Sequence, residues 1–475
     1  MNLEKIAEIC LFLSIVVAPF DGINIINFFI YNYAFCWTTT IGFIVYLICL
    51  LKYKKIYFGK LIKIWCVFFV WNIVSTIVNL ENIVGVVFKE HSAERMVLVS
   101  IVSLFFVLLM MLFYNYVLMK KENVIIWVYK GMKISFYIIT IFSIIQLLGM
   151  CEVQVAIDLN TAIQKIINIK YDLAISRGID INEEDFFSIK RIIGVSQEAS
   201  TFGNYMTCLF PWLILGAIYF DKKWKGIALC CLLVLFTVLS YSRIAYGCIF
   251  LELLIVMFLL KKSITIKQGL GVIIIISMII IGVISFLDVE DIFEKITGVF
   301  LSFSSEADLG RVYSNLTRIG LQVAGLNMFI FDPIFGLGLS QFRFNYIYFL
   351  PSWAYLSPEI VLATDTGSIG YFYSTFNTHI RVLAESGMVG FLIWISFFVS
   401  GIKNYLYVLK VIPNEKKIII KLIMLSYIMS VTGFMNFDEY TFFYYWLLLV
   451  LSNVLVSKVK KKEDILSINN LYRKQ

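Results

Sequence analysis

Long apolar runs separated by short polar gaps make up most of this chain. A membrane-spanning helix needs about 20 consecutive apolar residues, and about twelve runs in the sequence approach that length. The pattern therefore predicts an all-α, polytopic membrane helix bundle of about twelve transmembrane helices, and we expect residues 1–475 to form a single integral membrane domain. The runs lie at about 5–21, 26–51, 61–79, 97–119, 125–149, 201–220, 226–241, 244–260, 269–287, 384–403, 419–435 and 441–457.

The placement of charge predicts how the bundle is oriented. Charged residues make up only 15% of the chain, against roughly 25% in soluble domains. Lysines cluster in every second gap, which the positive-inside rule assigns to the cytoplasm. With an even number of spans, both termini are predicted to be cytoplasmic. Because the lysines lie at membrane edges, the formal charge of +8 does not indicate nucleic-acid binding. Examples of the clusters are Lys120 with Lys121, Lys222 with Lys223, and Lys458 with Lys460.

Two gaps on the predicted outer side are long, and loops beyond about 15 residues are usually functional or disordered. The first covers residues 150–200, and the second covers 288–383, between the ninth and tenth spans. Within the second loop, polar positions recur at helical spacing opposite an apolar face, which predicts an amphipathic helix near the membrane surface. Asp332-Pro333 ends that helix, because proline cannot continue it. The polar positions are Arg311, Asn315, Arg318 and Gln322.

Arginines gather on the predicted outer side, where the positive-inside rule would make them scarce. A guanidinium group suits bidentate contact with phosphate, so the four together predict a phosphate-binding site. The alternative is that each is an interfacial anchor whose long side chain reaches the membrane surface. The four are Arg191, Arg243, Arg311 and Arg318.

Three further ionisable residues are candidates for a functional role. His379 lies at the outer edge of a span, where it can serve as a general base or as an interfacial histidine. Glu198 places a carboxylate beside the segment that Arg191 opens. Glu252 falls in the middle of a span, where carboxylates are costly and often functional, although a structural hydrogen bond to a neighbouring helix is equally compatible with the sequence.

The sequence predicts no metal site and no cofactor. Eight of the nine cysteines fall in apolar runs, where cysteine packs as a small hydrophobic residue. No Cys-x-x-Cys pair occurs, and the two histidines, His91 and His379, are far apart in the chain. Zinc and transition-metal sites need several such ligands.

Taken in order, several motifs resemble the O-antigen polymerase and O-antigen ligase superfamily of bacterial envelope proteins. The motif-bearing region covers about residues 190–400. Where the family commonly has His-Asn, this chain has Phe376-Asn377, and His379 follows close behind. The matching pieces are Ser242-Arg243, Gly310-Arg311, Asp332-Pro-Ile-Phe-Gly336-Leu-Gly338 and Leu383-Ala-Glu385-Ser-Gly387-Met-Val-Gly390.

The resemblance implies an enzyme that transfers a glycan, with inversion, on the outer face of the bacterial cytoplasmic membrane. The implied donor is an oligosaccharide on undecaprenyl pyrophosphate, and neither metal nor nucleotide is needed. The arginines would hold the pyrophosphate, and His379 would help the acceptor hydroxyl to attack, with Glu198 as the alternative base. The implied partners are this lipid-linked oligosaccharide, the lipid bilayer and a chain-length regulator protein.

Three functions remain open on the sequence. The first is a polymerase of lipid-linked repeat units of O-antigen or capsule. The second is a ligase that moves the glycan to a lipid A core or to a protein. The third is a transporter or flippase of lipid-linked sugars, which would be expected to show internal repeats and polar sites at the middle of the membrane. The polar residues gather at the outer edge and no internal repeat is evident, which favours an enzyme.

Overall fold

The computed structural model describes residues 3–23, 33–53, 59–168, 189, 191–260, 309–365 and 372–461. Within these ranges the regular secondary structure is helical apart from a short antiparallel hairpin of β1 (Val87–Phe88) and β2 (His91–Ser92). The expected ninth span at 269–287, the beginning of the second long loop and much of the first long loop lie outside the described residues.

Seven described helices are long and apolar enough to cross a membrane. They are α2 (Ala34–Tyr53), α3 (Lys60–Val78), α4 (Ala93–Lys120), α5 (Val124–Met150), α9 (Ala199–Leu215) with its continuation η3 (Gly216–Phe220), α17 (Thr378–Val411) and α19 (Phe443–Lys460). Four other helices, of 15 to 18 residues, coincide with further expected spans: α1 (Leu3–Val17), α10 (Lys223–Val238), α11 (Arg243–Leu260) and α18 (Lys417–Gly433). The all-α membrane fold is confirmed, whereas the count of twelve spans is not.

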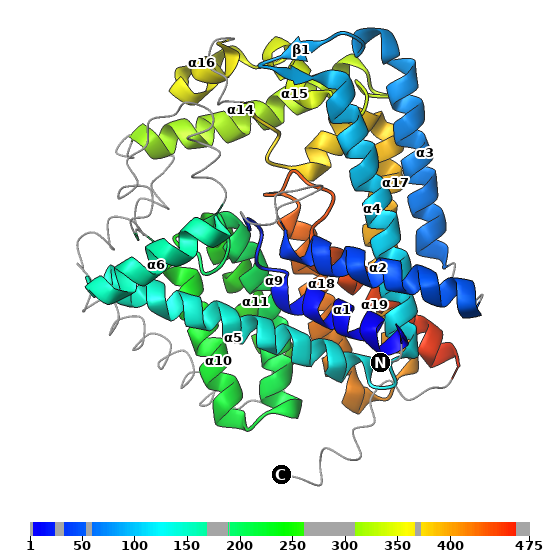
Figure 1. Ribbon diagram of the computed structural model, residues 1–475, viewed down its shortest axis with the longest axis vertical. Coiled ribbons are helices and arrows are strands. Elements are labelled where there is room, and N and C mark those ends of the chain that lie inside the picture. The colour runs from blue at the N-terminus through cyan, green and yellow to red at the C-terminus, as the bar shows by residue number, and fades with distance from the viewer. Residues whose placement is uncertain are drawn as a thin grey trace.

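Helix α19 lies at the centre of the bundle. Its residues from Phe443 to Leu451 are all buried, as expected of a helix that is apolar on every side. It packs against α17, α4 and α18, and Trp446 meets Trp65 of α3 edge-on, with ring centroids 4.8 Å apart. In Figure 1, α3, α4 and α17 stand on one side, α9, α10 and α11 stand on the other, and α1, α2 and α5 run across them.

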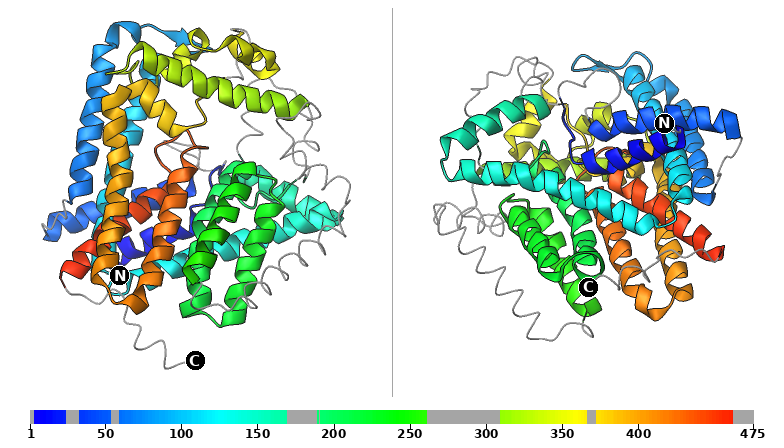
Figure 2. Two further views of the ribbon diagram at one scale, coloured as in Figure 1. Left: turned by 180° about the vertical axis from the view of Figure 1, so that it is seen from behind. Right: turned by 60° about the horizontal axis from the view of Figure 1, so that its bottom comes forward.

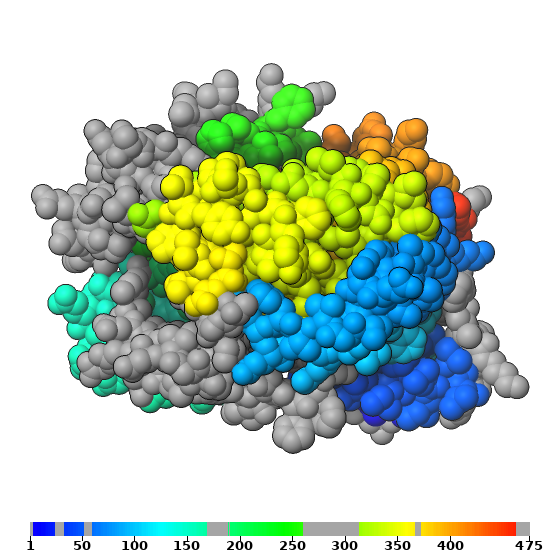
Figure 3. All heavy atoms as spheres, turned by 90° about the horizontal axis from the view of Figure 1, so that it is seen from above, coloured from blue at the N-terminus to red at the C-terminus, as the bar shows by residue number. Residues whose placement is uncertain are grey.

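Residues 309–365 form a cap over one end of the bundle (Figures 1 and 2). Seen from that end, the cap and the β1–β2 region cover much of the surface (Figure 3). The start of α1 and the Lys120–Lys121 pair lie at the opposite end, where Lys120 Nζ is 2.5 Å from Glu4 Oε1. The cap is thus opposite a lysine pair that the positive-inside rule assigns to the cytoplasm. Its elements are α14 (Leu309–Phe331), α15 (Phe342–Asn345), η4 (Tyr346–Tyr348), η5 (Ser352–Leu356) and α16 (Pro358–Thr364).

The segment that follows α14 docks into a break near the start of α17. Gly387 has φ 63° and ψ −168°, a conformation outside the right-handed helix, and it opens the backbone of α17 to an outside partner. We call this contact the backbone clamp, because main-chain groups make it. Its hydrogen bonds run from Leu337 N–H to Ala384 O at 3.0 Å, from Gly338 N–H to Glu385 O at 3.0 Å, and from Met388 N–H to Pro333 O at 2.8 Å.

Helix α3 supports the backbone clamp with buried polar side chains. Ser75 Oγ lies 2.7 Å from the carbonyl oxygen of Phe335 and 2.9 Å from that of Glu385. Asn79 Nδ2 donates a hydrogen bond of 2.8 Å to the carbonyl oxygen of Gly336. Main-chain carbonyl groups that leave regular structure inside a protein need such partners, so α3 is the third component of the clamp.

Replacing Gly387 with alanine is expected to destabilise the protein. The residue has a positive φ, and an added Cβ would collide with the carbonyl oxygen of Ile334. Strained backbone of this kind costs on the order of 1–3 kcal/mol. The measurement is the thermal unfolding midpoint of the detergent-solubilised protein. Gly247→Ala is the control, since a Cβ there meets nothing within 4 Å; equal midpoints for the two variants would contradict the role of the clamp.

Candidate functional site

Helix α14 brings polar side chains to the start of α11. Arg243 opens α11, and its Nη1 donates a hydrogen bond of 2.6 Å to Oδ1 of Asn315 on α14. Arg318 follows Asn315 by three residues, and its guanidinium carbon lies 5.4 Å from the ring centroid of Phe376. Arg311 lies about one turn before Asn315 on the same helix, although its side chain is outside the described atoms. Helical spacing places these α14 residues on one side of the helix.

Arg191 belongs to a tight turn that α5 holds in place. Gln146, a buried residue of α5, accepts hydrogen bonds from the N–H groups of Ile193 at 3.0 Å and Gly194 at 2.8 Å. Gly194 has φ 57°, a left-handed conformation that favours glycine. The turn therefore fixes the direction in which the chain leaves Arg191 for the start of α9.

Electrostatic interactions connect Arg191 with α14. Arg191 is an exposed residue; partial desolvation lowers its pKa, Glu198 raises that pKa, and the like charge of Arg318 lowers it. Arginine stays protonated in proteins, so two guanidinium charges act on each other here. A bound anion would relieve that repulsion. We call Arg191, Arg243 and Arg318 the arginine cluster; Glu198 lies beside it.

The structure places His379 in an aromatic environment. The residue lies in the first turn of α17, where its ring centroid is 5.2 Å from that of Phe398 and 6.0 Å from that of Phe434. Trp394 Nε1 donates a hydrogen bond of 3.1 Å to Nδ1 of His379. The histidine also interacts with the backbone of Val431 on α18 by a hydrogen bond. These contacts fasten the imidazole between α17 and α18.

A second charged group, which we did not predict, lies where α15, α17 and the turn before α19 meet. The Nε of Arg381, a residue 7% exposed, is 3.1 Å from each carboxylate oxygen of Glu385. Its Nη1 donates to the carbonyl oxygen of Asp438 at 2.6 Å and lies 3.5 Å from the Asp438 carboxylate. Arg343 Nη2 is 3.3 Å from that carboxylate. We call these four residues the ion-pair network.

A single turn connects the arginine cluster with the ion-pair network. Thr375 Oγ1 donates a hydrogen bond of 2.9 Å to Oδ1 of Asp438. The next residue, Phe376, lies against Arg318 of the arginine cluster. Phe376 occupies the place where the resembled family has its histidine, so this position borders an arginine even though its side chain cannot transfer a proton.

The sequence did contain a signal for part of this network. Arg381 and Glu385 are four residues apart, a spacing that makes side chains neighbours on a helix. Asp438 and Glu439 interrupt the short gap between the last two apolar runs. Carboxylates next to the hydrocarbon region are costly and often functional, yet nothing in the sequence indicates which arginine they meet.

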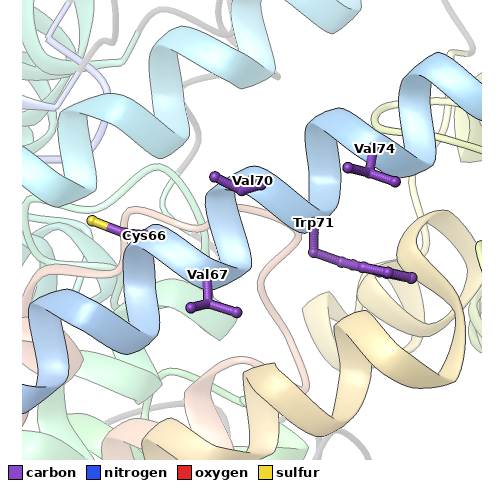
Figure 4. A pocket seen from close by; sticks show the side chains of 5 residues that line it. All are labelled: Cys66, Val67, Val70, Trp71 and Val74. Carbon is purple, nitrogen blue, oxygen red and sulfur yellow. The ribbon is translucent and has the colours of Figure 1, made fainter.

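An apolar groove of about 320 Å³ runs along α3 (Figure 4). Trp71 separates it from the backbone clamp: its Nε1 donates a hydrogen bond of 2.8 Å to the carbonyl oxygen of Ser386, and its ring stacks on Phe335 at 5.4 Å. All of the lining residues of the groove belong to α3, and none of them is a predicted site residue. Its lining consists of Cys66, Val67, Val70, Trp71 and Val74.

The fold is that of a polytopic membrane helix bundle with a cap over one end, and the arginine cluster includes Arg318 of the cap helix α14. No group of three or more His, Cys, Asp or Glu side chains in the described part of the chain is placed to hold a metal ion. Residues 228–395 match the family model described as O-antigen ligase. This match supports the O-antigen polymerase and ligase superfamily, whose members are glycosyltransferase-like enzymes. No curated protein matches the chain.

The matched segment contains only part of the charged site. Arg243, Arg318 and His379 lie within residues 228–395, whereas Arg191 and Asp438 lie outside them. Contacts of the fold, not the matched segment alone, therefore bring the remaining charged residues to the site.

Proposed function

We propose that the protein polymerises undecaprenyl-pyrophosphate-linked oligosaccharide repeat units, of O-antigen or capsule, on the outer face of the bacterial cytoplasmic membrane. The observation that carries the proposal is the approach of α14 to Arg243 and Arg191 beneath the cap. Arg243 bonds Asn315 of α14 and Arg191 interacts electrostatically with Arg318 of α14, and guanidinium groups bind phosphate oxygens in a planar, bidentate manner. In this proposal Arg311 adds a fourth guanidinium from α14.

The proposed reaction needs charge stabilisation more than it needs a reactive cofactor. The acceptor sugar hydroxyl attacks C1 of the first sugar of the donor, a new C1–O bond forms, and the bond from C1 to the pyrophosphate oxygen breaks. Undecaprenyl pyrophosphate leaves with the bonding electron pair, and the acceptor's proton passes to a base. Arginines placed at the developing negative charge lower the barrier, and such preorganised groups are usually the largest catalytic contribution.

The direct test uses purified protein and one substrate. Incubation with an undecaprenyl-pyrophosphate-linked repeat unit alone is expected to yield lipid-linked chains of two or more repeats, separated by gel or mass spectrometry. A ligase would leave chain length unchanged and would transfer the glycan only when a lipid A core or a protein acceptor is added. A chain-length regulator, the partner we propose, would narrow the distribution of lengths.

One observation favours the transporter alternative, and it has its own test. Glu252 of α11 is fully buried, and neither carboxylate oxygen has a hydrogen-bond partner in the described part of the chain. Such residues mark ion and proton pathways in transporters. We expect Glu252→Gln to leave polymer length and yield at the wild-type level, because the amide keeps the size of the side chain and the proposed reaction does not use it. Loss of product with normal protein level would favour transport.

A further inference from the structure

We propose that Glu439 is the base that accepts the proton of the acceptor hydroxyl, an inference that rests on the glycan-transfer function proposed above. Glu439 lies in the turn between α18 and α19, next to Asp438 of the ion-pair network. Neither the family match, which ends at residue 395, nor the sequence motifs point to it.

Two hydroxyl groups orient the carboxylate. Tyr33, just before α2, hydrogen-bonds to Glu439 through its phenol. Thr441 Oγ1 donates a hydrogen bond of 3.3 Å to Oε2 of Glu439. A carboxylate has about four acceptor positions, so these two donors fix its direction and leave room for a substrate hydroxyl.

Two chains of contacts connect Glu439 with the segments that carry the arginine cluster. On one side, its neighbour Asp438 bonds Thr375, and the following residue Phe376 contacts Arg318. On the other side, Tyr33, which hydrogen-bonds to Glu439, interacts electrostatically with Asp21.

Asp21 in turn is hydrogen-bonded to the segment that carries Arg191. Its Oδ1 accepts a hydrogen bond of 2.8 Å from the backbone N–H of Gln197. Gln197 precedes Glu198, the residue that influences the pKa of Arg191. Both routes lead from Glu439 to segments bearing the arginines, so a donor held by those arginines brings its reacting sugar toward this carboxylate.

Two buried polar atoms beside the ion-pair network have no hydrogen-bond partner among the described residues, which is evidence that a polar ligand binds there. Arg343 Nε is buried and has no hydrogen-bond partner among the described residues, and the same holds for Oε1 of Gln341. Gln341 is 1% exposed. Buried polar atoms are nearly always hydrogen-bonded in native proteins. Hydroxyl groups of a sugar can both donate and accept, which matches one orphaned donor and one orphaned acceptor on the same segment.

The surroundings tune the carboxylate for proton transfer. Burial raises the pKa of Glu439 above its ordinary value, and the hydrogen bond with Tyr33 opposes that rise. The net effect is a raised pKa, which lies closer to neutral pH, and a general base works best when its pKa is near the pH of the reaction. The titratable or charged groups that act on it, from every neighbouring element, are Tyr33, Cys36, Tyr205, Arg343, Arg381 and Asp438.

The two candidate bases indicated by the sequence, His379 and Glu198, make hydrogen bonds to other protein groups. His379 Nδ1 accepts a hydrogen bond from Trp394, and the same ring is hydrogen-bonded to the backbone of Val431. Glu198 accepts a hydrogen bond of 3.0 Å from Ser200 Oγ and interacts with Arg191. Glu439 also accepts two hydrogen bonds, but both donors are neutral and its pKa is raised, which suits a group that gains and loses a proton in each cycle.

The test compares substitutions in the purified full-length protein. Transfer from the lipid-linked repeat unit is measured across pH, and binding of undecaprenyl pyrophosphate itself is measured in parallel. Glu439→Gln is expected to lower the transfer rate by roughly 10²–10⁴-fold, the usual contribution of a positioned base, with undecaprenyl pyrophosphate bound as in wild type. Glu439→Asp should recover part of the rate. The exposed Glu81→Gln is the matched control and should behave as wild type.

The pH profile separates a base from a structural carboxylate. A base must be ionised, so the wild-type rate should fall as pH drops through the raised pKa of Glu439, and the residual activity of Glu439→Gln should lack that fall. Full activity in Glu439→Gln, or an unaltered pH profile, overturns the assignment; loss in His379→Ala or Glu198→Gln would then identify the base. If wild-type protein binds undecaprenyl pyrophosphate yet transfers no glycan, the proposed function itself fails and the assignment falls with it.

Discussion

Arg243→Ala is expected to abolish the polysaccharide ladder while the protein remains in the membrane at its normal level. Arg243 connects α11 to α14 through its 2.6 Å hydrogen bond to Asn315, so the substitution removes a charge and a contact that positions α14. Loss of one group that stabilises developing charge typically lowers the rate by about 10²–10³-fold. Lysine should recover only part of the activity, because an ammonium group cannot make the planar, bidentate contact.

The assay for Arg243 is complementation of a deletion strain, with each variant at matched protein level and the polymer separated by gel. Arg95→Ala is the control, because Arg95 is an exposed arginine in the first turn of α4, near the cap but outside the arginine cluster. The same assay with Arg311→Ala and Arg318→Ala examines the α14 arginines. A normal ladder from Arg243→Ala would remove this residue from the proposed pyrophosphate site.

Arg381→Ala is expected to produce the largest loss of stability. The side chain contacts Glu385 and Asp438 in a buried setting, and its guanidinium carbon lies 5.2 Å from the ring centroid of Tyr440. Removing one partner of a buried ion pair leaves an uncompensated charge and typically costs about 3–5 kcal/mol. The measurement is the unfolding midpoint of the purified protein in detergent.

A double substitution separates lost charge pairing from lost packing. Arg381→Leu with Glu385→Leu removes one charge of each sign and fills the space with apolar groups, which often restores stability at buried pairs. We therefore expect the double variant to unfold at a higher temperature than Arg381→Ala. A wild-type midpoint for Arg381→Ala would show that the ion-pair network contributes little to the folded state.

The sequence predicted the parts of the fold that depend on local periodicity. Apolar runs identify helices such as α4 and α5, because the requirement to span hydrocarbon acts on each segment separately. Gly336 and Gly338 of the Asp332–Gly338 motif both have positive φ, 69° and 95°, a conformation that favours glycine. What the glycines approach could not be predicted, because the partner, the break at Gly387, is nearly fifty residues away in the chain.

The charged site was predicted only where a helix alone determines the arrangement. Arg318 and Arg311 share one side of α14 because of helical spacing, and that reasoning needs no tertiary structure. The pairing of Arg381 with Asp438 joins residues 57 positions apart, and no local rule indicates it. His379 was read from its place in a motif, whereas its ring direction follows from Trp394 and Phe398, which lie farther along the same helix.

The backbone clamp has a consequence for protein engineering. Because main-chain atoms form it, the exposed side chains of Ile334 and Met388 can vary while the connection between α14 and α17 keeps its geometry. A chimera that exchanges the cap between two members of the superfamily should therefore carry the whole Asp332–Gly338 segment, with its glycines, together with α14. A chimera junction inside that segment would change the backbone around the N–H groups of Leu337 and Gly338, so that they would no longer point at the carbonyl oxygens of α17. With both junctions outside that segment, the exchange transfers the cap as one unit and leaves the membrane bundle unaltered.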